Sequence, residues 1–365
     1  MSVLSGASRE LTAEAPSSMA AAAAVYRRRT LARLAVLGGL ALATAVAFIV
    51  SMMVGPIPLT FGDVVRALVD PAADARAATV VIDLRLPPAL LAVLVGASLS
   101  LAGVQMQTIL DNPLAEPFTL GISAAAALGA AIAIVWGVTL PFAPGATLPV
   151  AAMVGGLAAS LLVAGVARVR TVTRETTVLL GVALVFSCQA LLALLQYRAS
   201  TESLQQIVFW TMGSTMRATW VAVASVAFAL LVATPLFWVH GWRLTAMTLG
   251  ESRAASMGID VVSLRSWTLV GVALLASLSV AHVGIIGFVG LVGPHIARLL
   301  VGEDQRFLMP AALLSGAALL SAAHAASQVV VPGVAVPVGI LTALVGVPCF
   351  LLLVFGRRGR AGVGG

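Results

Sequence analysis

The chain contains long runs of apolar residues that carry almost no charge. Eight runs of roughly 20 residues, the length that crosses a bilayer as an α-helix, lie at about 31–54, 86–110, 118–138, 147–167, 176–197, 219–239, 308–330 and 334–355. A further stretch, 266–301, is long enough for two spans and is broken near Gly284 and again at Gly293-Pro294. The pattern predicts an all-α polytopic membrane protein with about ten transmembrane helices.

Composition supports lipid as the main solvent of this chain. Charged residues make up only 10% of the sequence and hydrophobic residues 60%, whereas soluble domains carry about 25% charged residues. So few charges cannot cover a surface that faces water. The apolar runs are also continuous, without the alternating ten-residue segments of an outer-membrane barrel.

The distribution of arginine tests the number of spans, because all 21 basic residues are arginine. With ten spans and a cytoplasmic N-terminus, only Arg66, Arg76, Arg85, Arg198 and Arg217 lie outside, which agrees with the positive-inside rule. We therefore expect a disordered cytoplasmic tail at 1–30, a transmembrane domain at 31–356 and a cytoplasmic C-terminal tail at 357–365. The basic residues form no stripe, so nucleic-acid binding is not expected.

Several kinds of chemistry are missing from the sequence. A chain without lysine cannot supply the lysine of a nucleotide-binding P-loop. The 14 carboxylates fall in tails, loops or span ends, which disfavours coupling to an ion gradient. The four histidines lack metal-ligand spacing, and His240 lies beside Trp238 and Trp242 as an interfacial anchor. We expect no catalytic residue, no metal site and no cofactor bound by this chain.

One polar segment, 249–259, lies between two apolar runs and is framed by Gly250 and Gly258. Glu251 lies near a helix start, where its charge suits the helix dipole. Ala254, Ala255 and Met257 would offer a small apolar face to a partner's groove. From periodicity alone, an ordinary amphipathic loop and a docking site for a separate ATPase remain equally open.

A series of motifs between about residues 33 and 356 is more specific. These motifs are RLP at 85–87, LVGASLSLAGVQ at 94–105, DNPLAEP at 111–117, LGE at 249–251, GFVGLVGPHIAR at 287–298 and VPVGI at 336–340. In this order they resemble the FecCD family, the membrane subunits of bacterial ABC importers for iron-siderophores, haem and vitamin B12.

The resemblance implies ten helices arranged as two five-helix inverted repeats in the bacterial inner membrane. It also implies a second permease subunit, a cytoplasmic ATPase dimer that binds ATP and Mg²⁺, and an extracytoplasmic substrate-binding protein. The segment 245–262 would couple the permease to the ATPase. Its matching residues are Leu249, Gly250, Glu251, Ser252, Arg253, Ala254, Met257 and Gly258.

The resemblance further places Asn112 and Leu114 at an inner gate of the translocation path. Gln105 and Gln107, at the end of the second span, either face the path or hydrogen-bond a neighbouring helix. By contrast, Gly96, Ser100 and Gly103 are expected to be close helix-packing positions.

At the outer face, the resemblance assigns docking of the binding protein to Arg85. However, Pro88 and Gln328 stand where the vitamin B12 branch has two further arginines, and His324 stands where the family often has an aspartate. Either Arg66 and Arg76 replace those charges, or the partner in a heterodimer supplies them.

The expected function is that of a permease subunit of an ATP-driven importer for a metal chelate, with a ferric siderophore as the first substrate to consider. Haem and vitamin B12 are alternatives, and a secondary carrier without an ATPase is a less favoured one. The sequence leaves open the identity of the chelate, the choice between homodimer and heterodimer, and the role of residues 1–30.

Overall fold

The computed structural model describes residues 15–166 and 174–356, and in these ranges the chain is helical without β-strands. Seven helices are long and apolar enough to cross a membrane, and three shorter apolar helices accompany them, which matches the predicted ten. The ten are α2 (Ala15–Met53), α5 (Leu86–Leu110), α6 (Ile122–Val135), α7 (Thr147–Val166), α8 (Arg174–Arg198), α10 (Trp220–Val239), α13 (Val261–Val283), α14 (Val289–Val301), α15 (Gln305–Ser327) and α16 (Val338–Gly356).

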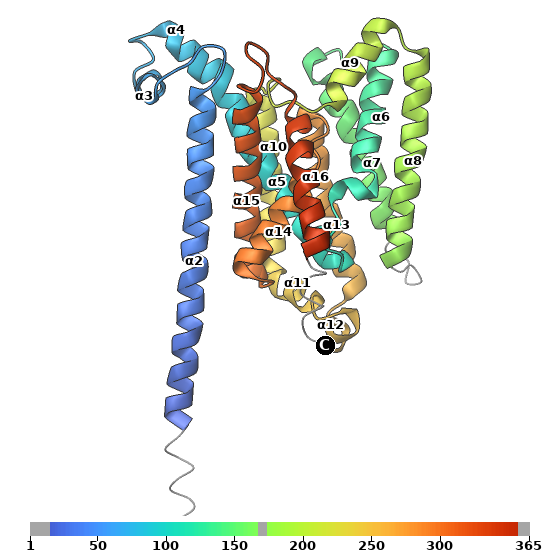
Figure 1. The fold of residues 1–365 in the computed structure, drawn as a ribbon. Coiled ribbons are helices and arrows are strands. Elements are labelled where there is room, and N and C mark those ends of the chain that lie inside the picture. The colour runs from blue at the N-terminus through green and yellow to red at the C-terminus, as the bar shows by residue number, and fades with distance from the viewer. Residues whose placement is uncertain (1–14, 167–173, 357–365) are drawn as a thin grey trace, which may run out of the picture.

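Short helices lie at the two ends of this bundle (Figure 1). At the end called outer here are α3 (Phe61–Val69), α4 (Ala75–Ala78) and α9 (Thr201–Thr211), and at the opposite, inner end are α11 (Gly241–Met247) and α12 (Glu251–Ser256). Both the start of α2 and the C-terminal end of α16 point toward the inner end. An even number of crossings requires this arrangement.

Helix α2 begins at Ala15, whereas we expected a disordered tail up to residue 30. Alanine is the strongest helix former, and five consecutive alanines at 20–24 continue the apolar helix beyond the bilayer. At about 1.5 Å per residue, 39 residues exceed the roughly 30 Å hydrocarbon core. Figure 1 accordingly shows α2 projecting past the inner end of the bundle. Residues 1–14 and 357–365 of the predicted tails lie outside the described ranges.

The second span also begins earlier than predicted. The chain is helical from Ala75, through α4 and the π-helical turn η1 (Thr79–Arg85), into α5. Pro87 and Pro88 lie in the first turn of α5, where missing backbone N–H groups cost least. A π-helical turn just before them absorbs the change in hydrogen-bonding pattern.

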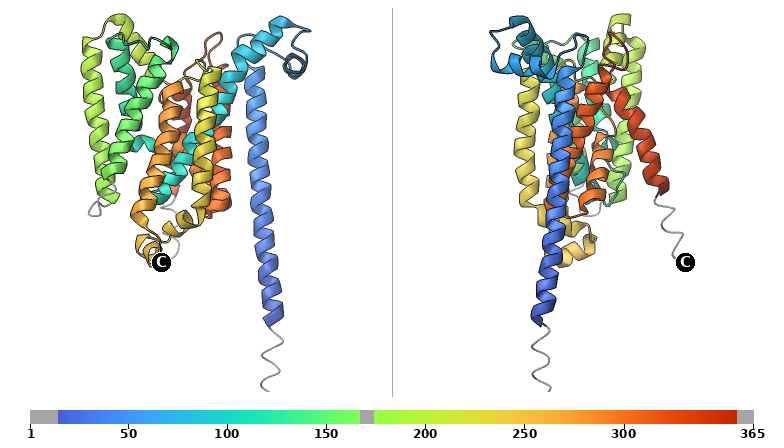
Figure 2. Two further views of the ribbon diagram at one scale, coloured as in Figure 1. Left: turned by 180° about the vertical axis from the view of Figure 1, so that it is seen from behind. Right: turned by 60° about the vertical axis from the view of Figure 1, so that its left-hand side comes forward.

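The two halves of the bundle repeat one packing pattern with opposite direction (Figure 2). Helix α5 of the first half packs against α15, and its counterpart α13 packs against α7. Likewise α6 packs against α7, and α14 packs against α15. Helix α5 runs from the outer to the inner end and α13 runs back. These relations are those of two five-helix inverted repeats.

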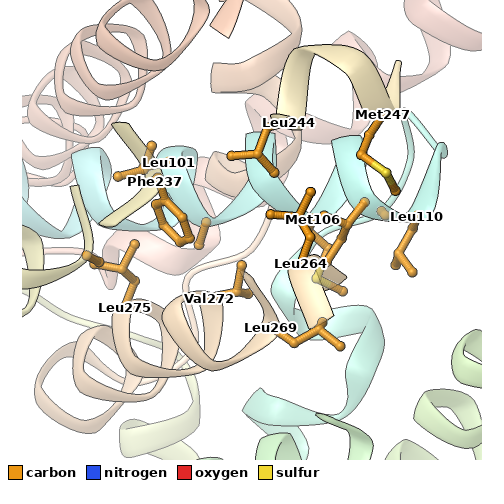
Figure 3. Close-up of a cluster of buried hydrophobic side chains, with 14 of the residues drawn as sticks. Leu101, Met106, Leu110, Phe237, Leu244, Met247, Leu264, Leu269, Val272 and Leu275 are labelled. Atoms are coloured by element: carbon orange, nitrogen blue, oxygen red, sulfur yellow. The ribbon is translucent and has the colours of Figure 1, made fainter. Parts of the chain in front are cut away.

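A buried apolar cluster connects the inner-end helices to the membrane-spanning ones (Figure 3). Its side chains come from α5, α10, α11 and α13: Leu101, Met106, Leu110, Phe237, Leu244, Met247, Leu264, Leu269, Val272 and Leu275. Close-packed side chains transmit displacement because they leave little free volume. A force on α11 therefore reaches three spanning helices directly.

Glycines let α5 approach its neighbours backbone to backbone, as expected for Gly96 and Gly103. A Cβ on Gly96 would lie 2.3 Å from the carbonyl oxygen of Gly316, and a Cβ on Gly103 would lie 1.9 Å from that of Gly290. Ser100 belongs to the same contact, since its Oγ lies 2.4 Å from where a Cβ on Gly293 would be. These positions serve helix packing.

Candidate functional site

The predicted coupling segment is a helix–turn–helix that protrudes from the inner end of the bundle (Figure 1). Helix α11 follows α10 directly, and α12 follows a turn at Gly250 with φ of 100°. A second turn at Gly258, with φ of 82°, leads to Asp260, whose carboxylate caps α13. Such φ values are readily available to glycine and strained for other residues. The two glycines thus form the turns on either side of α12.

The surface of this segment is mixed in character. Leu249 and Met257 are each 54% exposed, and Ser252 and Arg253 are exposed between them. Ala254 is 0% exposed and belongs to the buried cluster below α12. The expectation that Ala254 faces a partner is therefore corrected: it faces this chain's own core. Two large exposed apolar side chains remain available for a partner.

Glu251 lies in the first turn of α12, as predicted, and its carboxylate forms an ion pair with the guanidinium of Arg265 in α13. Arg265 is almost completely buried. Breaking a buried ion pair by removing one partner is strongly destabilising. Glu251 therefore fastens α12 to α13 from within the subunit.

The predicted inner-gate residues lie in the turn after α5. Asp111 adopts φ of 48°, and the Asn112 side-chain carbonyl accepts a hydrogen bond of 2.9 Å from the backbone N–H of Leu114. This is the local bond by which asparagine stabilises turns. The Leu114 side chain is exposed and points away from the subunit core.

Gln105 and Gln107, which we considered for the path, point into the bundle. Gln105 Nε2 donates to Gln305 Oε1 of α15 at 3.3 Å, and Arg298 Nη1 of α14 donates to Gln107 Oε1 at 2.7 Å. Gln305 also donates to Thr108 Oγ1 at 2.9 Å. Of the two roles considered for Gln105 and Gln107, the structure shows hydrogen bonds to neighbouring helices. The sequence analysis did not single out Gln305. Its only sign in the sequence is that this amide residue directly follows Asp304, which caps the next helix.

Glu116 lies in a loop, as predicted for the carboxylates, but this loop packs inside the bundle. After α5 ends, the chain turns back along it: a Cβ on Gly290 would lie 3.2 Å from the carbonyl oxygen of Leu99 and 3.7 Å from Cβ of Glu116. Leu99 lies near the middle of α5. The carboxylate accepts a hydrogen bond from the backbone N–H of Phe288, just before α14. Glu116 is therefore a loop residue that lies beside the middle of α5 and the start of α14.

The outer face differs from the docking surface that the sequence predicted. Arg85 is only 8% exposed, and its guanidinium donates to the carbonyl oxygens of Met52, at 2.7 Å, and Ile57. It fixes the end of α2 and cannot contact a partner. Arg66 on α3 and Arg76 on α4 are exposed. They alone of the three predicted docking residues are placed to contact a partner.

Two of the three family departures at the outer end, His324 of α15 and Gln328 at its C-cap, also point inward. Both are buried, and His324 Nδ1 lies 2.9 Å from Thr215 Oγ1. The amide of Gln328 lies 3.4 Å from the carbonyl oxygen of Ser51 in α2. A buried polar network at this end fastens α2 and α15 to the loop before α10.

An apolar cavity of about 740 Å³ opens on the bundle between the end of α9, residues 285–288 and α16. Met212, Phe288, Ile340 and Leu344 are among its lining side chains, and no charged side chain lines it. Exposed apolar residues continue along α8 and α16. This face has the size and chemistry to enclose a bulky ligand without binding it through charges.

Comparison with known proteins agrees with these features. The model of the FecCD transport family matches residues 42–356. An iron chelatin transport system permease of Helicobacter pylori is 38% identical over 77% of this chain and 83% of its own length. The hemin transport system permease HmuU of Yersinia pestis is 35% identical over 76% of this chain and 83% of its own length.

A solved structure shares the fold. It is assigned as a metal-chelate type ABC transporter in an inward-facing conformation, with a TM-score of 0.77, 31% identity and coverage of 88% of this chain and 98% of its own. The family match and this shared fold explain the ten apolar helices, the paired half-bundles and the protruding segment together. The chain belongs to the FecCD transport family and is a multi-pass ABC transporter permease.

Proposed function

We propose that this chain forms the membrane path of an ATP-driven importer for a metal chelate in a bacterial inner membrane. A ferric siderophore is the first substrate to test, with haem and vitamin B12 as alternatives. The energy comes from a separate ATPase dimer, since this chain has no lysine for a P-loop. Both chain termini and α11–α12 then lie in the cytoplasm.

The observation that carries the proposal is the construction of the protruding segment. It presents Leu249 and Met257 to solvent, it is fastened to α13 by the Glu251–Arg265 ion pair, and its base is part of the buried cluster shared with α5 and α10. A partner that grips this surface can move spanning helices as rigid bodies. An unattached amphipathic loop would not need these internal connections.

The apolar face of α8, α9 and α16 suits the path and a second permease subunit. Lipid or another membrane protein can cover the exposed apolar side chains of spanning helices, and the cavity beside α16 distinguishes this face from the others. In this proposal two copies, or this chain and a related one, enclose the chelate between such faces. Arg66 and Arg76 contact the extracytoplasmic binding protein, which provides affinity and selectivity.

The test is co-purification of the ATPase with a Leu249→Asp, Met257→Asp double variant, with all subunits co-expressed. Placing two carboxylates at the exposed apolar positions should abolish ATPase association, because charges would be desolvated in the partner's groove. Glu251 is left unchanged, since replacing it would break the ion pair with buried Arg265 and damage the permease itself.

Met216→Asp is the matched control, because Met216 is an exposed methionine on the loop before α10 at the outer end. It should retain the ATPase. If the double variant keeps the ATPase and its substrate-stimulated turnover, the coupling assignment is wrong. If wild type is active in vesicles without any ATPase, a secondary carrier replaces the importer. Uptake of ferric siderophore, haem and cobalamin, each with its binding protein, then separates the substrates.

A further inference from the structure

A second cavity, of about 430 Å³, lies at the inner end between α10, α11 and the start of α13. Leu236, Phe237, Ile259 and Leu264 form its apolar walls. Its volume is within the range of about 300–1,000 Å³ for small-ligand sites. The coupling assignment does not use this cavity.

The depth of the cavity is marked by three tryptophans. Trp238, Trp242 and Trp267 are each more than half exposed around it, and Trp267 lines it. Exposed tryptophan is enriched at the level of lipid headgroups, where the ring is partly apolar and the N–H meets water. The mouth of the cavity therefore lies at the membrane–water interface.

Two opposite charges line this cavity without neutralising each other. The Arg243 guanidinium packs over the Trp242 ring at 5.5 Å, and Asp260 Oδ1 accepts a hydrogen bond of 3.0 Å from the backbone N–H of Ser263. Neither side chain has an ion-pair partner among the described residues. Each retains hydrogen-bonding capacity for a ligand.

His240 provides a third polar group. Its Nδ1 lies 2.9 Å from the carbonyl oxygen of Leu236. Because a carbonyl oxygen can only accept, Nδ1 carries a proton, and in this tautomer Nε2 is left as an acceptor. The cavity thus combines one strong cation with two acceptors at the headgroup level.

We propose that this cavity binds the headgroup of a phosphatidylethanolamine molecule, with its phosphate on Arg243 and its ammonium on Asp260 and His240. A zwitterion with N–H donors satisfies both charges at once. Phosphatidylglycerol has no cation, so its phosphate would leave the Asp260 carboxylate without a positive partner. The choline ammonium of phosphatidylcholine has no N–H group to donate to Asp260 or His240. The acyl chains would lie along the exposed apolar surface of α10, beginning at Leu236.

The position of the cavity gives the lipid a consequence for coupling. Gly258, Ile259 and Asp260 form its wall and are also the link between α12 and α13. A bound headgroup would join this link to α10 and α11. It would thereby hold the protruding segment in one orientation relative to the membrane-spanning helices.

The test is native mass spectrometry of the permease alone, taken from nanodiscs of equal parts phosphatidylethanolamine, phosphatidylglycerol and phosphatidylcholine with identical acyl chains. Wild type should retain phosphatidylethanolamine preferentially. Arg243→Gln should lower retention roughly tenfold or more, since a charge-assisted contact is lost, and Arg243→Lys should restore most of it. Asp260→Asn keeps the helix cap but should lose the preference for phosphatidylethanolamine.

Arg198→Gln is the matched control, because Arg198 is an exposed arginine at the outer end of α8 and lines no part of this cavity. It should retain the lipid as wild type does. The proposal is overturned if wild type retains no lipid, if it prefers phosphatidylglycerol, or if Arg243→Gln binds like wild type. No ATPase is present in this measurement, so its result is independent of the proposed importer function.

Discussion

At the scale of single residues, the polar side chains of this permease mostly serve the subunit itself. Arg85 holds the end of α2, Gln107 bonds to Arg298, and Glu116 faces the backbone of Phe288. Phe288 has φ of 68°, which is uncommon for a residue other than glycine. Buried polar groups need partners because leaving one unpaired is costly. These contacts stabilise the points where helices break.

We predict that Glu116→Ala destabilises the permease and that Glu116→Gln does not. Alanine leaves the Phe288 N–H without its acceptor, at a cost of about 1–3 kcal/mol, whereas the glutamine carbonyl still accepts. Thermal unfolding of the purified protein in nanodiscs would show a lower Tm for alanine alone. If Glu116→Gln keeps the wild-type Tm but loses transport, the carboxylate has a direct role in translocation instead.

At the scale of elements, α5 is the central helix of the bundle. It contacts α10, α13, α14 and α15, and nearly all of its side chains are buried. Small residues allow this crowding, since TM helices pack most closely where glycine removes the side chain. The close packing of α5 against its neighbours thus depends on its glycines as well as on its hydrophobicity.

We predict that Gly96→Ala and Gly103→Ala prevent correct packing of α5. The added methyl groups would lie 2.3 Å and 1.9 Å from the backbone oxygens of Gly316 and Gly290, so whole helices would have to separate. Yield of monodisperse permease in detergent should fall several-fold, an overpacking cost of about 1–3 kcal/mol or more. Gly38→Ala in α2 is the control, because nothing lies within 4 Å of that position, and it should be tolerated. Normal yield for Gly103→Ala would contradict the contact.

At the scale of the whole molecule, two helix breaks determine the shape. The chain turns back after α5 at the inner end and after α13 at the outer end, and residues 111–121 and 284–288 lead back into the bundle without forming α-helix, so α6 and α14 are short. Non-helical backbone is tolerated at membrane depth only where it is buried in protein or lines a cavity. Here residues 285, 287 and 288 line the apolar cavity beside α16. The breaks therefore lie where a path between subunits would pass.

The orientation of the molecule gives a further prediction. In a Cys188→Ala, Cys349→Ala background, Ala73→Cys before α4 should react with a membrane-impermeant maleimide in spheroplasts. Ser256→Cys on α12 should react only after the membrane is opened. Both positions are exposed, at opposite ends of the bundle. The reverse labelling pattern would place the coupling segment outside and exclude docking of a cytoplasmic ATPase.

The sequence alone determined the apolar helices, their number, the family and the location of the protruding segment. Those features follow from local composition: run length decides whether a helix spans, and Gly250 and Gly258 mark the turns. Two predicted helix starts were too late, since the alanines at 20–24 extended α2 and the π-helical turn extended the second span.

Only the tertiary structure decided where individual side chains point. A spanning helix that is apolar all round has no amphipathic pattern to show which face is buried. Arg85 thus turned inward and not toward a partner, and Ala254 faced the core. Glu251 pairs with Arg265, fourteen positions later in the chain, and Glu116 lies beside the distant helix α14. Each of these four contacts depends on which helices become neighbours. The packing of the whole bundle determines those neighbours.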